Sequence, residues 1–154
     1  MVPEDRLAAL GLSLPPVSAP VGGYVPALIV GTRVVVSGQL PLVDGALKET
    51  GVVGTGPGQV SPDDARECAR IAALNALAAI AEATGGLGRV ARIVRITGYV
   101  ASDPGFTDQP AVVNGASDLM VEAFGEEGRH ARSAVGVAAL PLGAPVEIEV
   151  EASL

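Results

Sequence analysis

Aromatic residues are scarce in this sequence, and their scarcity limits what the chain can bind. Of 154 residues, two are tyrosine, two are phenylalanine and none is tryptophan. Proteins that hold single-stranded RNA stack its bases on aromatic side chains, so this composition does not predict an RNA-stacking surface. The core must be filled by Val, Ile, Leu and Ala, which favours thin layers and further burial of surface through oligomerisation.

Cysteine and histidine each occur once, as Cys68 and His130. A single cysteine cannot form an internal disulfide, and its position inside a predicted helix favours a buried structural thiol over a reactive one. One cysteine and one histidine complete a zinc site only if several carboxylates join them. The sequence therefore predicts no metal site.

Basic residues are also few. Ten Lys and Arg against seventeen Asp and Glu give a formal net charge of -7. Nonspecific nucleic-acid binding depends on cationic patches that release counterions, and the nearest basic cluster, formed by Arg89, Arg92 and Arg95, is thin. We therefore expect no nucleic-acid partner.

Long apolar runs are absent. None approaches the roughly 18 residues of a membrane span, and the N-terminus has no basic segment followed by an apolar one. We expect no membrane partner and a cytoplasmic location. With 49% apolar residues, the chain predicts one compact domain over residues 1–154, in which four prolines mark residues 1–22 as a short leading helix or arm.

The next part of the chain predicts a hairpin and a long loop. Residues 24–30 and 33–37 are β-rich runs, and Gly31 between them suits a tight turn. Residues 39–60 are rich in Gly and Pro, which predicts an ordered surface loop with at most a short strand near residues 51–53.

Two helices are predicted on either side of a strand. Ser61 supplies a hydroxyl N-cap and Pro62 suits the first helical position, so the first helix should run from there to about Thr84. Residues 90–101 alternate in the manner of a strand, and residues 109–124 predict the second helix.

The C-terminal part predicts strands that begin near Arg132 and at residues 146–151. The resulting fold class is α+β with the order ββαβαβ, in which two helices cover one face of a mixed sheet. The other face would then be exposed and would carry small apolar residues, which call for a partner. Packing around a threefold axis would supply one.

Arg132 and Glu147 are the candidate catalytic pair. A guanidinium matches the two oxygens of a carboxylate, and a nearby carboxylate orients a water molecule. If their two strands are adjacent, the site could hydrolyse a small anionic molecule. The plainer alternatives are a surface ion pair for Arg132 and a solvated strand face for Glu147.

Several motifs then point to one family. They are Gly23-Tyr24, SGQLP at residues 37–41, the helix with Asn75, Asn114, RSAVGVAALP at residues 132–141 and VEIE at residues 146–149. This combination resembles the reactive intermediate deaminase family, the Rid or YjgF-like proteins, which also carry the label endoribonuclease L-PSP. The resemblance implies chorismate-mutase-like subunits that form a homotrimer. It also implies interface sites that hydrolyse 2-imino or 2-enamino acids to 2-keto acids and ammonia without a cofactor.

The resemblance assigns roles to individual residues. Arg132 would hold the carboxylate of the small-molecule substrate, the backbone carbonyl of Ala134 would orient the imine nitrogen or the water, and Glu147 would position or deprotonate that water. A protonated imine is already electrophilic, so hydrolysis mainly needs this positioning. The residues expected to bind the substrate are Tyr24, Ser37, Gly38 and Asn114.

Two departures from the family pattern indicate a divergent branch. The loop at residues 43–60 is longer and richer in glycine, and His130 with Ala131 replaces a more apolar approach to Arg132. His130 is either a base or a surface residue beside a turn. Two other functions stay open: a noncatalytic trimer that binds a small carboxylate, and an endoribonuclease, which the acidic charge disfavours.

Overall fold

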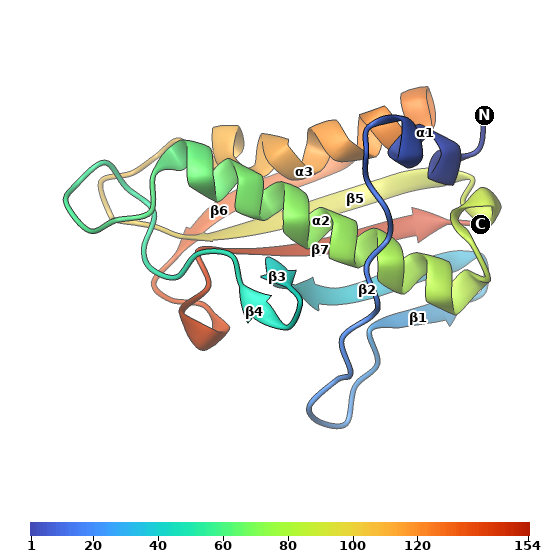
Figure 1. Ribbon diagram of the computed structural model, residues 1–154, viewed down its shortest axis with the longest axis horizontal. Helices are drawn as coiled ribbons and strands as arrows, with labels where there is room; N and C mark the ends of the chain where they lie inside the picture. The colour runs from blue at the N-terminus through green and yellow to red at the C-terminus, as the bar shows by residue number, and fades with distance from the viewer.

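A mixed sheet of five strands forms the centre of the computed structural model, which describes residues 1–154 (Figure 1). The strands are β1 (Ala27–Val30), β2 (Arg33–Gln39), β5 (Arg92–Ala101), β6 (Ala131–Val137) and β7 (Val146–Ser153). Their spatial order is β1-β2-β7-β5-β6. Only β5 and β6 run parallel, and the other neighbours are antiparallel. The predicted α+β fold class is confirmed.

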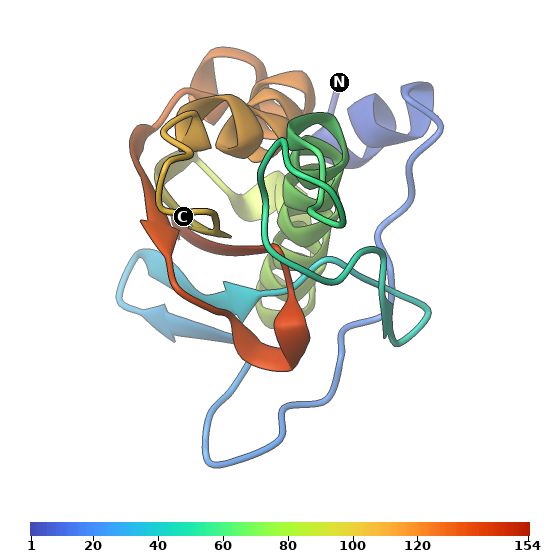
Figure 2. The same ribbon diagram turned by 90° about the vertical axis from the view of Figure 1, so that its left-hand side faces the viewer.

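Two long helices, α2 (Pro62–Thr84) and α3 (Gln109–Phe124), lie side by side across one face of the sheet (Figures 1 and 2). The predicted start of α2 is confirmed, because the Ser61 hydroxyl accepts a hydrogen bond from the backbone N–H of Asp64 at 3.1 Å. Gly85 ends the helix with a φ of 80°.

Small residues allow α2 and α3 to pack closely. The buried side of α2 is mostly alanine, and Gly115 of α3 lies so close to the backbone carbonyl of Arg66 that a side chain there would overlap it. On the outer side, Arg66 pairs with Asp118 at 2.6 Å. Exposed pairs of this kind contribute little stability, so the close contact of the two backbones dominates.

The predicted hairpin is present, and β1 and β2 pair on either side of a turn in which Gly31 has a φ of 60°. β1 begins at Ala27 rather than at residue 24, because Pro26 has no N–H to donate to a neighbouring strand.

A second, smaller hairpin lies in the segment predicted as a loop. It consists of β3 (Leu42–Val43) and β4 (Ala46–Leu47), which pair across Asp44 and Gly45. Both turn residues have positive φ, 51° and 82°, as a two-residue hairpin turn requires. The prediction of a loop with at most a short strand near residues 51–53 is wrong, because the strands lie at residues 42–47, and the Asp-Gly pair was a signal for this hairpin.

The leading segment forms a third helix, α1 (Pro3–Ala9), in agreement with the predicted short leading helix or arm; the order ββαβαβ did not include it. Its residue Leu7 is buried in the core, and α1 packs against α3. The carboxylate of Glu4 accepts a hydrogen bond of 2.6 Å from the backbone N–H of Leu87. The chain then crosses the outer surface of α2 before it reaches the sheet (Figure 1).

Besides β3 and β4, the predicted order ββαβαβ omits the last strand of the central sheet. β7 adds a final strand to that order, although the alternation of residues 146–151 predicted its residues correctly. Three short 3-10 helices complete the structure: η1 (Leu87–Arg89), η2 (Gly125–Gly128) and η3 (Pro141–Gly143).

The face of the sheet opposite the helices carries no other element of this chain (Figure 2). We call it the open face. It combines apolar residues such as Leu28, Val35 and Val135 with a row of carboxylates on β7. None of the helices has the length and apolar character needed to cross a membrane.

Candidate functional site

Strand β5 separates the two strands that carry Arg132 and Glu147. Arg132 lies opposite Ile96 of β5, and Glu147 lies opposite Tyr99. Since successive residues of a strand point to opposite faces, Arg132 points to the helices and Glu147 to the open face. The prediction that adjacent strands bring these two side chains together within one chain is wrong.

Arg132 lies half-buried between β6 and α3. Its Nη1 donates hydrogen bonds to Asn114 Oδ1 at 2.7 Å and to Ser117 Oγ at 3.1 Å. Asn114 and Ser117 are one turn apart on α3 and therefore share a face. Arg132 forms no ion pair with any carboxylate of this chain. Neutral groups hold the guanidinium, and its charge is unpaired.

His130 continues this hydrogen-bond network. Its Nδ1 lies 2.6 Å from the carbonyl oxygen of Gly128, and its Nε2 lies 3.0 Å from Ser117 Oγ. Burial lowers the pKa of His130; the bond to Gly128 acts against this, and the charge of Arg132 adds to it. His130 is therefore not simply a surface residue beside a turn.

Ala134 follows Arg132 on the same face of β6, opposite Gly98 of β5. It is half-buried and packs against the hydrophobic core. β6 pairs with β5 alone, so it is an edge strand with one unpaired side. Arg132, Asn114 and Ala134 thus lie together at this edge, and we call them the arginine group.

Glu147 lies against Gly38 on the open face. A side chain at Gly38 would overlap the Glu147 carboxylate, so glycine makes this close approach possible. Burial raises the pKa of Glu147, and the negative charge of Glu149 raises it further.

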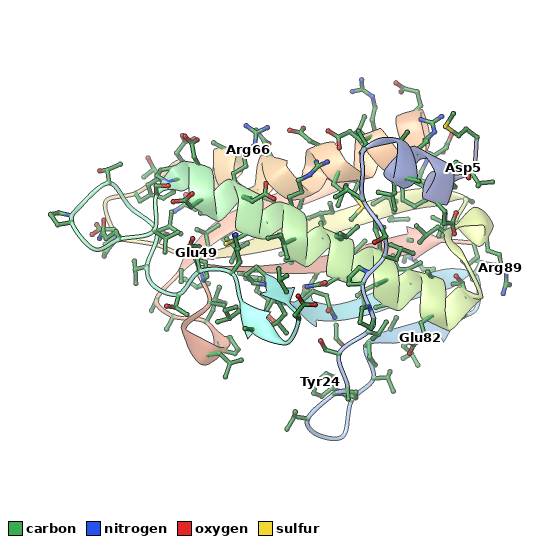
Figure 3. The ribbon with its side chains drawn as sticks, viewed as in Figure 1. Asp5, Tyr24, Glu49, Arg66, Glu82 and Arg89 are labelled. Carbon is green, nitrogen blue, oxygen red and sulfur yellow. The ribbon has the colours of Figure 1, made fainter.

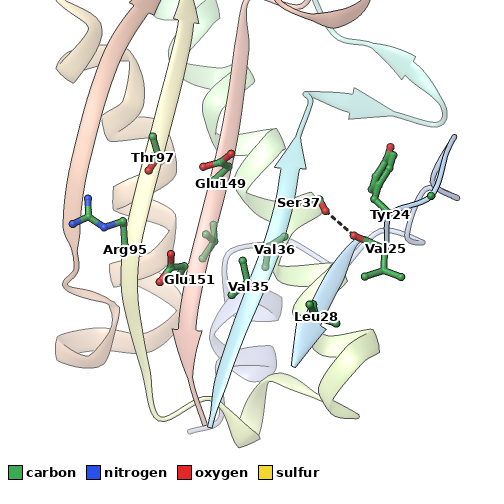
Figure 4. Close-up of a pocket in the computed structure, with 12 residues that line it drawn as sticks. Tyr24, Val25, Leu28, Val35, Val36, Ser37, Arg95, Thr97, Glu149 and Glu151 are labelled. Atoms are coloured by element: carbon green, nitrogen blue, oxygen red, sulfur yellow. Dashed lines mark hydrogen bonds between the residues drawn. The ribbon is translucent and has the colours of Figure 1, made fainter. Parts of the chain in front are cut away.

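Ser37 precedes Gly38 on β2, and Tyr24 lines the same cavity as Ser37. The Ser37 hydroxyl donates a 2.6 Å hydrogen bond to the carbonyl of Val25, which fastens the N-terminal segment to β2 (Figure 4). Tyr24 is 54% exposed and lies on the segment that projects away from the helices (Figure 3). Tyr24 and Ser37 both line a cavity of about 510 Å³ on the open face, together with Glu149.

The predicted site residues thus form two groups within one chain. The arginine group lies at the β6 edge on the helix side. The second group, which we call the glutamate group, lies on the other side of the sheet and consists of Tyr24, Ser37, Gly38 and Glu147.

Two residues near these groups, Ser117 and Tyr99, were not predicted as site residues. Ser117 contacts Arg132, and its spacing of three residues from Asn114 on a predicted helix was an available signal. The Tyr99 hydroxyl donates a 3.1 Å hydrogen bond to Glu149. Burial raises the pKa of Tyr99, and Glu149 adds to the shift.

Comparison with known proteins places this geometry in a family. The family described as "YjgF/chorismate_mutase-like, putative endoribonuclease" matches residues 4–153. The chain belongs to this YjgF-like family. The predicted resemblance and the chorismate-mutase-like fold are therefore confirmed.

Individual relatives agree with this assignment. The chain is 43% identical to Protein TCP17 of Trypanosoma cruzi over 154 residues, which covers 97% of this chain and 94% of the relative. A crystal structure from Shewanella oneidensis, described as a putative endoribonuclease, is 36% identical with a TM-score of 0.95 and full coverage of both chains. RidA from an Antarctic Psychrobacter is 31% identical with a TM-score of 0.62, over 90% of this chain and 94% of RidA.

Proposed function

We propose that the protein is a hydrolase that converts 2-imino or 2-enamino acids to 2-keto acids and ammonia without a cofactor. The observation that carries this proposal is the state of Arg132, which two side chains of α3 orient while no carboxylate neutralises it. Such a guanidinium suits a small carboxylate, because its fork of donors matches two carboxylate oxygens. Similarity to a structure named RidA supports the reaction class.

Each site in this proposal lies between two protomers of a homotrimer. The reaction needs Arg132 and Glu147 beside one small substrate, yet in a single chain they occupy different strands and opposite faces of the sheet. The arginine group of one protomer would therefore meet the glutamate group of the next. Trimer formation would also cover the exposed apolar residues of the open face, among them Leu28 and Val135.

The chemistry then needs no strong nucleophile. With its carboxylate on Arg132, the protonated imine is attacked at C2 by water, and Glu147 accepts the proton that the water loses. The resulting carbinolamine takes that proton on its nitrogen, which leaves Glu147 ionised again. The C–N bond then breaks as the C=O bond forms, ammonia leaves, and the hydroxyl proton passes to Glu147 and from there to ammonia or solvent. An enamino acid first takes a proton at C3 to become the imine. The carbonyl of Ala134 would accept a hydrogen bond from the substrate nitrogen.

The surroundings of Glu147 favour its role as the base. Burial and the charge of Glu149 both raise its pKa, so the carboxylate holds a proton more tightly than an exposed one. A base is most effective when its pKa lies nearer to the working pH.

The sharpest test combines two strongly impaired variants, Arg132→Ala and Glu147→Gln. The two variants are mixed in equal amounts, and their trimers are dissociated and allowed to reassemble. Release of 2-keto acid is then followed with an amino acid oxidase as the source of imine. Random trimers would place intact Arg132 and intact Glu147 in the same interface site in about a quarter of sites, so about a quarter of the activity should return. If the mixture is no more active than the two impaired variants alone, a site shared between protomers is contradicted.

A noncatalytic binding protein is the second candidate, and one observation favours it. The arginine group is assembled within one chain and forms without Glu147. A trimer that binds 2-keto acids through Arg132 but releases no product faster than the uncatalysed reaction would support this function. An RNA-binding assay at several salt concentrations separates both candidates from an endoribonuclease, and we expect no binding, given the net charge of -7.

A further inference from the structure

The hydrogen bonds of Arg132 occupy only one of its three nitrogens. A guanidinium has five N–H donors: two on each Nη and one on Nε. Both bonds to α3 come from Nη1, one to Asn114 and one to Ser117. Nε and Nη2 make no hydrogen bond to the protein, and they form the edge of a guanidinium that binds a carboxylate side-on.

His130 determines which way the Ser117 hydroxyl points. The carbonyl of Gly128 can only accept, so the proton of a neutral His130 ring lies on Nδ1. Nε2 must then accept, and the hydroxyl of Ser117 donates to it. A lone pair of Ser117 Oγ is thereby left for Arg132 Nη1.

We propose that Ser117 and His130 are positioning residues that, with Asn114, occupy both Nη1 protons of Arg132 and reserve its Nε–Nη2 edge for a substrate carboxylate. The nature of that carboxylate rests on the proposed function. The choice of the Nε–Nη2 edge, and the positioning of Arg132 by Ser117 and His130, go beyond the proposed function.

The charges around this network do not compete for Arg132. In the neighbouring η2 turn, Glu126 pairs with Arg129 at 3.1 Å, and Glu127 pairs with Arg92 at 2.8 Å. Burial also lowers the pKa of His130, which keeps the ring neutral and able to accept from Ser117 at neutral pH.

Without His130, the Ser117 hydroxyl would lose its fixed acceptor. A serine within a helix then turns its O–H toward the carbonyl three or four residues earlier. Its bond to Arg132 would no longer be fixed, and the guanidinium would rotate about its last side-chain bonds. The expected consequence is weaker carboxylate binding with little effect on the fold.

Binding of 2-oxobutanoate, a small 2-keto acid, to the full-length protein tests this by calorimetry. Ser117→Ala should weaken binding by roughly tenfold, as expected for the loss of one hydrogen bond to a charged group. Ser117→Thr retains the hydroxyl and should restore most of the affinity. In turnover, Ser117→Ala should raise KM more than it lowers kcat.

Asp118→Ala is the matched control. Asp118 is the next residue on α3, but it is exposed and pairs with Arg66 instead of Arg132. The affinity of Asp118→Ala for 2-oxobutanoate should equal that of the wild type. If Ser117→Ala binds as tightly as this control, the positioning role is wrong.

The protein has one histidine, so its ring ¹⁵N signals need no assignment. The wild type should show the tautomer with the proton on Nδ1, and Ser117→Ala should show a mixture. A wild type with the proton on Nε2 would overturn the proposal, even if the protein binds carboxylates. If Ser117→Ala weakens binding but Arg132→Ala does not, then Arg132 does not bind the carboxylate, and the proposed positioning of Arg132 is wrong as well.

A wild type that binds no 2-keto acid would count against the proposed function and against the reserved edge. The positioning of Arg132 would then be judged separately from its side-chain ¹⁵N signals, which Arg132→Ala identifies. They should be sharp in the wild type and broadened in Ser117→Ala, and equal line widths would overturn the positioning role.

Discussion

The arginine group and the glutamate group are built in opposite ways. Arg132 is held by the neutral partners Asn114 and Ser117 at the edge of the sheet, and Ser117 is itself bonded to His130. Glu147 lies on a central strand, against the backbone of Gly38 and near the like charge of Glu149. One group orients a cation, while the other destabilises an anion.

The difference shows what each group lacks. Neither Arg132 nor Glu147 forms an ion pair within the chain. In the proposed interface site, the substrate carboxylate would supply the anion that Arg132 lacks, and a water molecule would supply the proton that Glu147 accepts. The two groups would therefore act on one substrate without neutralising each other.

The largest expected effect comes from removing the cation. Arg132→Ala should lower kcat/KM for imine hydrolysis by about three orders of magnitude, because two charge-assisted hydrogen bonds to the substrate are lost. Coupled assays of 2-keto acid release measure this. The control Arg66→Ala removes an exposed arginine that pairs with Asp118, and it should retain full activity. Equal activities of the two variants would remove Arg132 from the site.

Removing the anion should have the next largest effect. Glu147→Gln should lower kcat by about 100-fold with KM changed little, as expected for the loss of a general base. In the wild type, activity should fall as the pH drops through the pKa of Glu147, which is raised above that of an ordinary glutamate. This limb of the profile should be missing in the variant.

The control for Glu147 is Glu151→Gln on the same face of β7. Glu151 pairs with Arg33 at 3.3 Å and lies farther along the strand. Its pH profile should match the wild type. A Glu147→Gln enzyme that keeps the acidic limb would show that another group is the base.

A smaller effect is expected from crowding the carboxylate while keeping it. In Gly38→Ala the new methyl group would displace the Glu147 side chain, which is flexible at its end, so the fold should persist. We expect kcat to fall by roughly tenfold because a misplaced base loses part of its contribution. Gly88→Ala is the control, since a methyl group there meets no atom within 4 Å. Thermal unfolding of both variants checks that the loss is not one of stability.

The smallest effect concerns the pKa of Glu147 itself. Glu149→Gln removes a neighbouring negative charge, so the Glu147 carboxylate ionises more easily and its pKa falls. The acidic limb of the pH profile should therefore move to lower pH. The shift should be small because burial, the larger cause of the raised pKa, remains. A limb that moves to higher pH would mean that Glu149 does not act through its charge.

Local patterns in the sequence were enough to predict most elements. The caps at Ser61 and Gly85 and the alternation of residues 146–151 depend on neighbouring residues, and the structure agrees with them. The small hairpin at Asp44 and Gly45 was missed because its strands are two residues long and show no periodicity.

The candidate site could be predicted less completely from the sequence, because its geometry depends on contacts between segments that are distant along the chain. Arg132 was predicted as a carboxylate anchor from its own motif, but its partner Ser117 precedes it by 15 residues and lies on another element. Nothing in the run of residues around Glu147 indicates that Gly38 lies against it.

The sequence by itself determined the fold class, the family and the residue types available for chemistry, because turn residues, caps and hydrophobic periods act over a few positions. Only the tertiary structure decided that β7 lies between β2 and β5, and therefore that Arg132 and Glu147 point away from each other in one chain. Strand neighbours are chosen by hydrogen bonding and packing across the whole sheet, and a residue's own surroundings in sequence do not encode that choice.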